Sequence, residues 1–192
     1  YDFQYLSGFD EVEGIHARGD WDLSRHQEYS GTKMEYIDQE KGEKFLPNVM
    51  ETSGGLTRMV LAVIDNALVE EELENGKTRT VLKIKPSLAP IKAAVFPLQK
   101  DEKLQGLSKD IFDNLKKELV VEYDNAGNIG KMYRRQDEIG TPFCVTVDHQ
   151  AMEDDTVTLR YRDTMQQERV AITELENIIG NQVSYKNLFE TI

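Results

Sequence analysis

Strand-like and helix-like patterns alternate through the second half of the sequence, and this alternation constrains the fold most. The apolar segment 91–98 is typical of a buried strand, whereas leucine and isoleucine recur at four-residue spacing in 104–119, as on one face of a helix. Short strands are also predicted at 120–123, 143–147, 156–162 and 170–172, and helices at 128–139, ended by Gly140, and at 174–179. Such alternation within about 100 residues predicts a compact α/β domain with a partly parallel sheet.

The predicted strand 156–162 alternates apolar and polar residues. Its polar positions are Thr158, Arg160 and Arg162, each following an apolar or aromatic residue. Because successive side chains of a strand point to opposite faces, we expect one face against the core and one exposed face that carries both arginines.

The first half of the sequence is organised differently. A strand is predicted at 45–52 and an apolar helix at 56–68, with Gly54 and Gly55 between them. A short strand at 11–15 and a short helix at 21–26 are predicted upstream of this pair.

The boundary between the two halves follows from a polar segment and two prolines. A turn is predicted at Asn75–Gly76, and Pro86 and Pro90 interrupt any regular element that follows. We therefore predict one domain over residues 1–85 and a second over residues 86–192.

Composition limits the class of protein. The net charge is −12, which argues against a protein that coats nucleic acid through a large basic surface, although Lys and Arg cluster locally in 131–135 and 160–169. No apolar run of about 18 residues predicts a membrane helix, and the first residues do not resemble a signal peptide. The single cysteine, Cys144, excludes an internal disulfide and a cysteine-based zinc site. No metal site is predicted, and a cytoplasmic location without membrane contact fits this composition.

The strand–glycine–helix segment around Gly54 and Gly55 carries the clearest chemistry. The start of a helix presents free N–H groups and the positive end of its dipole, which suits phosphate, and glycines let a ligand approach the backbone. Arg58 in the first turn adds a planar set of donors for phosphate oxygens. Glu51 followed by Ser53 could hold an ammonium group. Taken alone, the two glycines could equally serve only to relieve strain in the turn.

A resemblance to a known family adds to this interpretation. The pattern Glu51-x-Ser53-x-Gly55-x-x-Arg58 before an apolar helix resembles the third signature motif of class II aminoacyl-tRNA synthetases, in its glycyl form. Residues 11–23 resemble the segment that precedes this motif in glycyl-tRNA synthetases. The segments 128–148 and 156–165 are similar to the anticodon-binding domain of that family. These blocks follow the family order and cover most of the chain.

The resemblance implies a fold and an activity. It implies that residues 1–85 are the end of an antiparallel-sheet catalytic domain, and that residues 86–192 are an α/β anticodon-binding domain with a mixed sheet. The implied reaction activates glycine with ATP, accompanied by Mg²⁺, to glycyl-adenylate, and transfers glycine to tRNA(Gly). The other two signature motifs belong upstream of Tyr1, so the resemblance implies a fragment that is inactive alone, from an enzyme that is dimeric when complete.

The resemblance also implies roles for individual residues. Arg58 is the expected catalytic residue on the ATP phosphates. The expected glycine contacts are Glu51, Thr52, Ser53, Gly54 and Gly55. The expected ATP contacts are Glu11, Val12, Gly55, Leu56, Thr57 and Arg58. The expected anticodon contacts are Tyr133, Arg134, Arg135, Arg160 and Arg162.

Alternatives remain open at several of these positions. Arg160 and Arg162 could instead form a solvated strand face, and Asp137 or Glu138 could hold Arg134 or Arg135 through helical ion pairs. His16 could lie near the site or be a half-buried core residue. The whole chain could also be a non-catalytic synthetase-like accessory protein or an RNA- or protein-binding module. The presence of Glu51, Ser53 and Arg58 favours the enzyme.

Overall fold

The computed structural model describes residues 2–5, 8–73 and 76–189. The chain forms two compact units, residues 1–65 and residues 66–192. The predicted turn at Asn75 lies outside the described residues. The functional boundary expected at 85/86 stays a prediction.

The first unit is built from short antiparallel pairs and two helices. β1 pairs with β2, β3 with β6, and β4 with β5. Its elements are β1 (Asp2–Tyr5), β2 (Gly8–Glu11), β3 (Glu13–Gly19), α1 (Trp21–Ser30), β4 (Tyr36–Ile37), β5 (Lys44–Phe45), β6 (Val49–Gly54) and α2 (Leu56–Ala67), whose last residues belong to the second unit.

The β3–β6 pair has two distinct faces. Its register places Gly14 opposite Ser53 and His16 opposite Glu51. Since cross-strand partners and alternate residues share a face, these four residues lie on one face. The other face is open to solvent, since Ile15, Met50 and Thr52 on it are exposed.

The second unit contains all remaining elements. They are β7 (Leu68–Glu72), β8 (Thr78–Leu82), β9 (Ala93–Pro97), α3 (Glu102–Leu115), β10 (Val121–Tyr123), α4 (Ile129–Ile139), β11 (Phe143–Val147), α5 (Ala151–Asp154), β12 (Thr156–Tyr161), β13 (Gln167–Ala171), a 3₁₀ turn (Ile172–Glu174), α6 (Leu175–Val183) and α7 (Lys186–Phe189).

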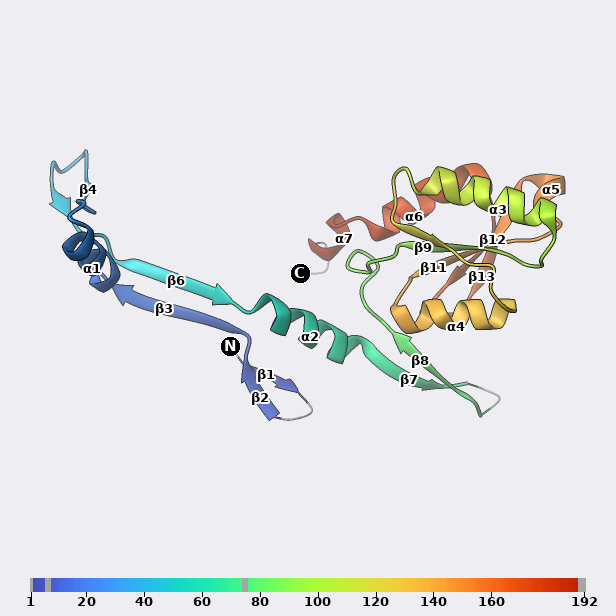
Figure 1. Ribbon diagram of the computed structural model, residues 1–192, viewed down its shortest axis with the longest axis horizontal. Coiled ribbons are helices and arrows are strands. Elements are labelled where there is room, and N and C mark those ends of the chain that lie inside the picture. Colours follow the sequence, from blue (N-terminus) through green and yellow to red (C-terminus); the bar gives the residue numbers. More distant parts are fainter. Residues whose placement is uncertain (1, 6–7, 74–75, 190–192) are drawn as a thin grey trace. The chain divides into compact units, whose positions relative to one another are not determined.

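A five-stranded sheet forms the centre of this unit (Figure 1). The strand order is β10-β9-β11-β12-β13. β9 is parallel to both β10 and β11, whereas β11–β12 and β12–β13 are antiparallel. The mixed sheet predicted from the sequence is therefore confirmed.

Helices cover both faces of the sheet, with α3 and α6 on one side and α4 on the other (Figure 1). The α3 face is the larger apolar core, where Leu104, Ile111 and Leu115 pack with Leu175 and Ile179 of α6. The α4 face holds a smaller cluster, Ala94, Phe96, Met132 and Cys144. Two covered faces explain why β9 and β11 are buried throughout, as expected for central parallel strands.

The ends of α4 follow from local chemistry. The Asn128 side chain accepts a hydrogen bond from Lys131 N at 3.0 Å, which caps the helix start. Gly140 ends the helix with a left-handed φ of 84°. This confirms the predicted stop at Gly140, because residues with a Cβ rarely adopt that conformation.

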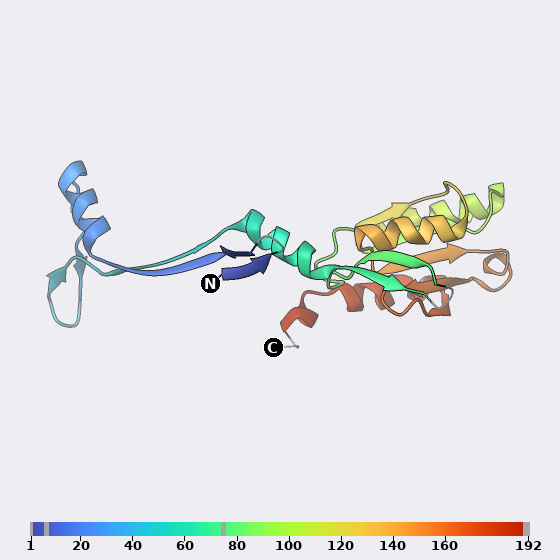
Figure 2. The same cartoon turned by 90° about the horizontal axis from the view of Figure 1, so that it is seen from below.

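The hairpin formed by β7 and β8 is the main element that the sequence did not predict. β7 and β8 pair antiparallel from Leu68–Leu82 to Glu72–Thr78, and β8 lies beside α4 (Figure 1, Figure 2). Arg79 and Val81 are buried while Thr78 and Thr80 are exposed. The alternation of apolar and polar residues that marks a strand is not visible in the sequence of β8, because one of its buried positions is an arginine.

Candidate functional site

A pocket of about 230 Å³ in the first unit gathers residues from three segments. It lies where the end of β2, the end of β6 and the first turn of α2 meet. Each residue that lines it is among those expected to contact ATP or glycine: Glu11, Val12, Ser53, Gly54, Gly55 and Arg58. The structure thus brings together residues that are far apart in the sequence. Glu11 and Arg58, for example, are 47 positions apart.

Backbone contacts hold this pocket in shape. Gly55 N donates to Val12 O at 3.0 Å, and Arg58 Nη1 donates to Glu11 O at 2.5 Å. A Cβ at Gly55 would lie 3.3 Å from Arg58 Cδ, so glycine leaves room for the arginine stem to cross the turn. The guanidinium and the first N–H groups of α2 therefore border the same pocket. This combination suits the oxygens of a phosphate chain.

Leu56 and Thr57 also lie in the first turn of α2. Both side chains are exposed. They do not line the pocket, so their contact with ATP stays a prediction.

Glu51 and Ser53 share the open face of the β3–β6 pair. Glu51 is half-buried, and its carboxylate forms an ion pair with Arg18 Nη1 at 2.9 Å. Arg18 also donates to Asp22 at the start of α1. Sequence reasoning missed Arg18, which lies at a β-bulge between Ala17 and Gly19 and reaches Glu51 from there.

The side chain of Thr52 does not lie on the same face of the strand pair as those of Glu51 and Ser53. Thr52 pairs with Ile15, so its side chain lies on the opposite face from Glu51 and Ser53. A Thr52 side-chain contact with glycine is not compatible with this register, although its backbone remains at the strand end.

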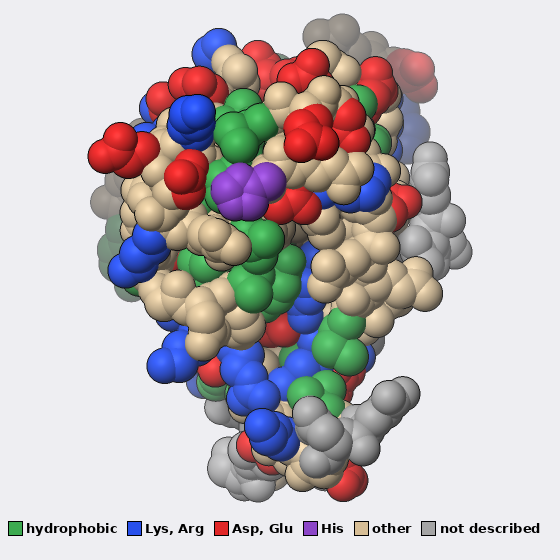
Figure 3. Space-filling view, turned by 90° about the vertical axis from the view of Figure 1, so that its right-hand side faces the viewer, with side chains coloured by type: hydrophobic (Ala, Val, Ile, Leu, Met, Phe, Trp, Pro, Cys, Tyr) green, Lys and Arg blue, Asp and Glu red, His purple; other side chains and the backbone are tan. Residues whose placement is uncertain are grey.

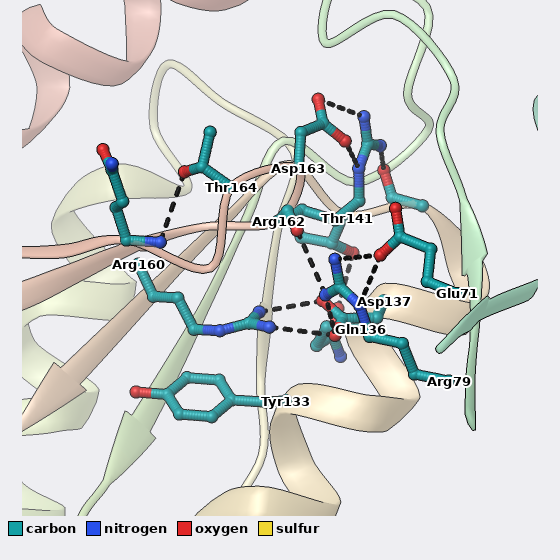
Figure 4. Close-up of polar contacts among 12 residues, drawn as sticks. Glu71, Arg79, Tyr133, Gln136, Asp137, Thr141, Arg160, Arg162, Asp163 and Thr164 are labelled. Atoms are coloured by element: carbon teal, nitrogen blue, oxygen red, sulfur yellow. Dashed lines mark hydrogen bonds and ion pairs between the residues drawn. The ribbon is translucent and has the colours of Figure 1, made fainter. Parts of the chain in front are cut away.

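In the second unit, the buried carboxylate of Asp137 joins three elements. Arg160 Nη1 and Nη2 of β12 donate to its two oxygens at 2.8 and 3.0 Å, and Arg79 Nη1 of β8 donates at 3.1 Å (Figure 4). Arg79, Asp137 and Arg160 are 4%, 2% and 5% exposed. Burial lowers the pKa of Arg160, but the hydrogen bonds and charge of Asp137 more than offset this, so the pKa is raised. Because a buried charge is stable only when paired, this cluster fastens α4, β8 and β12 together.

Arg162 is also buried, at 1% exposure. Its guanidinium donates to Gly140 O at 2.7 Å and Ile84 O at 2.8 Å, and its Nε donates to Asp163 (Figure 4). The exposed face predicted for 156–162 is therefore wrong at Arg160 and Arg162. The physical reason is that α4 and β8 cover this face, and that carboxylate and carbonyl oxygens satisfy both guanidiniums.

The other three expected anticodon contacts lie on α4. The Tyr133 ring lies under Arg160, with 4.6 Å from Cζ to the ring centroid, and its hydroxyl contacts Thr146 Oγ1 at 2.6 Å. Arg135 donates to Asp124 at 2.9 Å and is half-buried, whereas Arg134 is exposed.

The alternative helical ion pairs do not form. Asp137 binds Arg79 and Arg160, and Asp124 binds Arg135. Within the described residues, no ion pair joins Glu138 to Arg134 or Arg135.

A family comparison assigns the second unit. Residues 92–182 match the family model of the anticodon binding domain. The second unit contains an anticodon-binding domain. A solved prolyl-tRNA synthetase from Cryptosporidium parvum, in complex with L-proline and AMP, has a similar fold, with a TM-score of 0.66 over 91% of this chain and 35% of that chain. At 20% identity this likeness shows the fold alone, and it confirms the predicted α/β class.

Curated relatives extend the similarity to almost the whole chain. The chain is 50% identical over 191 residues to a glycine–tRNA ligase of Treponema denticola, and 51% identical over 186 residues to that of Clostridium beijerinckii. Each alignment covers 96% of this chain, but only 42% and 40% of the relatives. The resemblance to glycyl-tRNA synthetases is confirmed, and the chain spans about two fifths of the length of these relatives.

Charge is unevenly spread over one face of the anticodon-binding domain. Acidic side chains gather in the upper part of this face, and Lys and Arg side chains gather in the lower part (Figure 3). α4 lies on the lower side of the sheet in Figure 1, and its outer surface exposes Lys131 and Arg134. Of the basic residues singled out from the sequence, these two are the best placed to meet an RNA backbone.

The described residues contain neither a membrane-spanning helix nor a cluster of metal ligands. No helix there is long and apolar enough to cross a membrane. No group of three or more His, Cys, Asp or Glu side chains there could hold a metal ion.

Proposed function

We propose that this chain is the part of a glycine–tRNA ligase that contains one wall of the ATP and glycine site together with the anticodon-binding domain. The observation that carries the proposal is the identity of 50–51% with glycine–tRNA ligases over 96% of the chain. Two structural features support it. Four of the six predicted ATP contacts line one pocket, and α2 exposes apolar side chains such as Val60 and Leu61 that a larger protein would cover.

The proposed reaction has two steps. An oxygen of the glycine carboxylate attacks the α-phosphorus of ATP and displaces pyrophosphate, which gives glycyl-adenylate. A terminal ribose hydroxyl of the tRNA then attacks the glycyl carbonyl and displaces AMP, and the hydroxyl proton is released. The protein contributes chiefly by holding the reactants in line and by stabilising the developing negative charge.

Arg58 and Glu51 have distinct proposed roles in the first step. Arg58 and the N-terminal turn of α2 bind the phosphates of ATP. Glu51 accepts a hydrogen bond from the glycine ammonium, which directs the carboxylate toward the phosphate. The Arg18–Glu51 ion pair holds the Glu51 carboxylate on the open face of the strand pair.

We propose that Mg²⁺ accompanies ATP at this pocket. Glu11 and Ser53 offer a carboxylate and a hydroxyl at its rim, and Mg²⁺ in nucleotide sites commonly takes one or two protein oxygens plus phosphate oxygens. When bound there, the ion would share the negative charge of the phosphates. Glu11 and Ser53 are the residues of this chain that would hold it.

We further propose that the domain over residues 86–192 binds the anticodon region of tRNA(Gly) through α4. Arg134 and Arg135 would contact RNA, with Tyr133, Arg160 and Arg162 supporting α4 from beneath. This proposal follows the exposure of the side chains, since RNA contacts require accessible donors and stacking surfaces. The remaining proposals, a homodimeric complete enzyme in the cytoplasm, rest on the resemblance alone.

Pyrophosphate exchange tests the function directly. The complete protein should exchange labelled pyrophosphate into ATP only when glycine is present, and should charge tRNA(Gly). The 192-residue chain should show no exchange by itself. Exchange that does not depend on glycine would reject glycine as the substrate, whereas no exchange from the complete protein would favour a non-catalytic synthetase-like protein.

A further inference from the structure

His16 lies on the same face as the two residues proposed to bind glycine. The register pairs His16 with Glu51 and Gly14 with Ser53, so these four positions form a compact square on the open face of β3 and β6. The side chains of Glu51 and Ser53 both lie on this face. A ligand held by Glu51 and Ser53 therefore approaches from the side on which His16 lies.

The imidazole of His16 occupies the space above Gly14. A Cβ added to Gly14 would lie 2.4 Å from His16 Nε2 and 3.2 Å from Ser53 Oγ. The first distance is shorter than any non-bonded contact allows, so no side chain can stand at position 14 while the ring keeps this place. Gly14 is buried although glycine has no side chain of its own, because the ring and Ser53 cover it.

Gly14 has no backbone reason to be glycine. It lies within the strand β3, and it is not among the glycines with positive φ, in contrast to Gly19 at the end of the same strand. A glycine inside a strand loses packing and costs conformational entropy, and it commonly marks close approach of another group. Here the approaching group is the imidazole ring.

We infer that His16 is a specificity-determining residue that closes the amino-acid site against side chains larger than hydrogen. The inference rests on the proposed function, and specifically on Glu51 binding the ammonium of the substrate. With the ammonium at Glu51, the Cα of the amino acid lies next to Ser53, and the ring borders the space where a β-carbon would project. Glycine fits, whereas L-alanine would push its methyl group toward the imidazole.

The expected size of the effect follows from small-pocket discrimination. One additional methylene in a pocket changes kcat/KM by about 10- to 200-fold. Removing the ring should therefore raise the kcat/KM for L-alanine relative to glycine by at least about tenfold.

The experiment uses the complete enzyme and three variants. Pyrophosphate exchange is measured with glycine and with L-alanine in the unsubstituted enzyme, His16→Ala, Gly14→Ala and the control His26→Ala. His26 is exposed on α1, and its substitution should change neither rate. His16→Ala should raise the alanine-to-glycine ratio while glycine activation stays within a few-fold. Gly14→Ala should act in the same direction, because its methyl group displaces the ring from the other side.

The outcomes separate this inference from the function on which it rests. If the unsubstituted enzyme shows no glycine-dependent exchange, the proposed function fails. If that exchange is present and His16→Ala leaves the alanine-to-glycine ratio unchanged, only the role of His16 fails. An equal decrease in exchange with glycine and with L-alanine in His16→Ala would also overturn the inference. It would show that the ring supports the strand pair and does not form a wall of the pocket.

Discussion

At the scale of single residues, the Arg18–Glu51 ion pair occupies only part of the Glu51 carboxylate. Glu51 retains about a third of its side-chain exposure, so the pair leaves part of the carboxylate open. A second donor can therefore bind without displacing Arg18. A substitution at Glu51 is therefore a more informative test than one at a carboxylate whose oxygens are all occupied.

Replacing Glu51 with glutamine in the complete enzyme should weaken glycine activation. The substitution keeps the shape but removes the charge that strengthens the bond to an ammonium group, which is worth about 1.5–3 kcal/mol, or roughly 10- to 150-fold in kcat/KM. Glycine-dependent pyrophosphate exchange measures this. Glu28→Gln on α1 is a matched control, since Glu28 pairs only with the exposed Arg25 among the described contacts. An unaltered kcat/KM in Glu51→Gln would remove this residue from the glycine site.

Cys144 provides a pH-dependent test of the core. Burial raises the pKa of its thiol to about 12 from an ordinary value of 9.0. Between these pH values the unfolded chain releases a proton that the folded chain keeps. The contribution of the thiol to folding stability is therefore fully present below pH 9 and declines as the pH rises toward 12. The slope of this contribution approaches about 1.4 kcal/mol per pH unit.

The Cys144→Ala variant should lose stability less steeply over this alkaline range. The measurement is urea unfolding of the 192-residue chain and the variant from pH 8 to pH 10.5, followed by circular dichroism. Tyr161 contributes to the remaining slope of both proteins, because its hydrogen bond to Glu168 raises its pKa to about 12. Parallel pH profiles for the two proteins would show that the thiol is accessible in the folded state.

At the scale of secondary-structure elements, α4 depends on one carboxylate. Asp137→Asn removes the negative charge shared by Arg79 and Arg160, both of which stay buried. Breaking one partner of a buried ion pair costs about 3–5 kcal/mol. We expect the midpoint of urea unfolding to fall accordingly. Glu138→Gln, on the adjacent exposed position of the same helix, should leave the midpoint almost unchanged, and equal midpoints for both variants would contradict the role of Asp137.

The exposed side of α4 should determine how RNA binding responds to salt. An anticodon stem-loop of tRNA(Gly) should bind the complete enzyme more weakly as salt increases, because phosphate contacts release counterions. Replacing Arg134 with alanine should reduce the slope of log Kd against log salt by about 0.7, the value for one phosphate on a single strand. Fluorescence anisotropy at several salt concentrations measures the slope. Arg25→Ala on α1 is the control, and an identical slope for Arg134→Ala would place the RNA contact elsewhere.

Several of these elements could be predicted from the sequence, and the failures have physical causes. The strand at Phe143–Val147 and the helix stopped by Gly140 carry strong local signals, apolar continuity and a left-handed glycine. The hairpin β7–β8 and the burial of Arg160 carry none. Both depend on Asp137, a residue distant in sequence from Arg79, and composition treats arginine as a surface residue.

At the scale of the whole molecule, the same contrast applies to the candidate site. The family resemblance implied the residues that line the pocket, including Glu11 and Val12, which lie far from the strand–helix turn in the sequence. It did not predict Arg18, and it could not show on which side of the strand Thr52 lies. The orientation of a side chain across a strand depends on register, and register is set by the partner strand.

The ion pair between Arg79 and Asp137 also bears on where this polypeptide can be cut. Residues 86–192 contain Asp137 and Arg160 but not Arg79, so a recombinant domain that begins after the hairpin loses one of the two cations at the buried carboxylate. The same cut removes Val81, which is fully buried. A protease that cleaves in the exposed segment ahead of α2 leaves Arg79 and Asp137 on the same fragment. Cleavage between β8 and β9 places them on different fragments. An expression boundary ahead of Asn66 is therefore the one that preserves the packing of the anticodon-binding domain, because it also keeps Ala67 against Ile84 and Ala89.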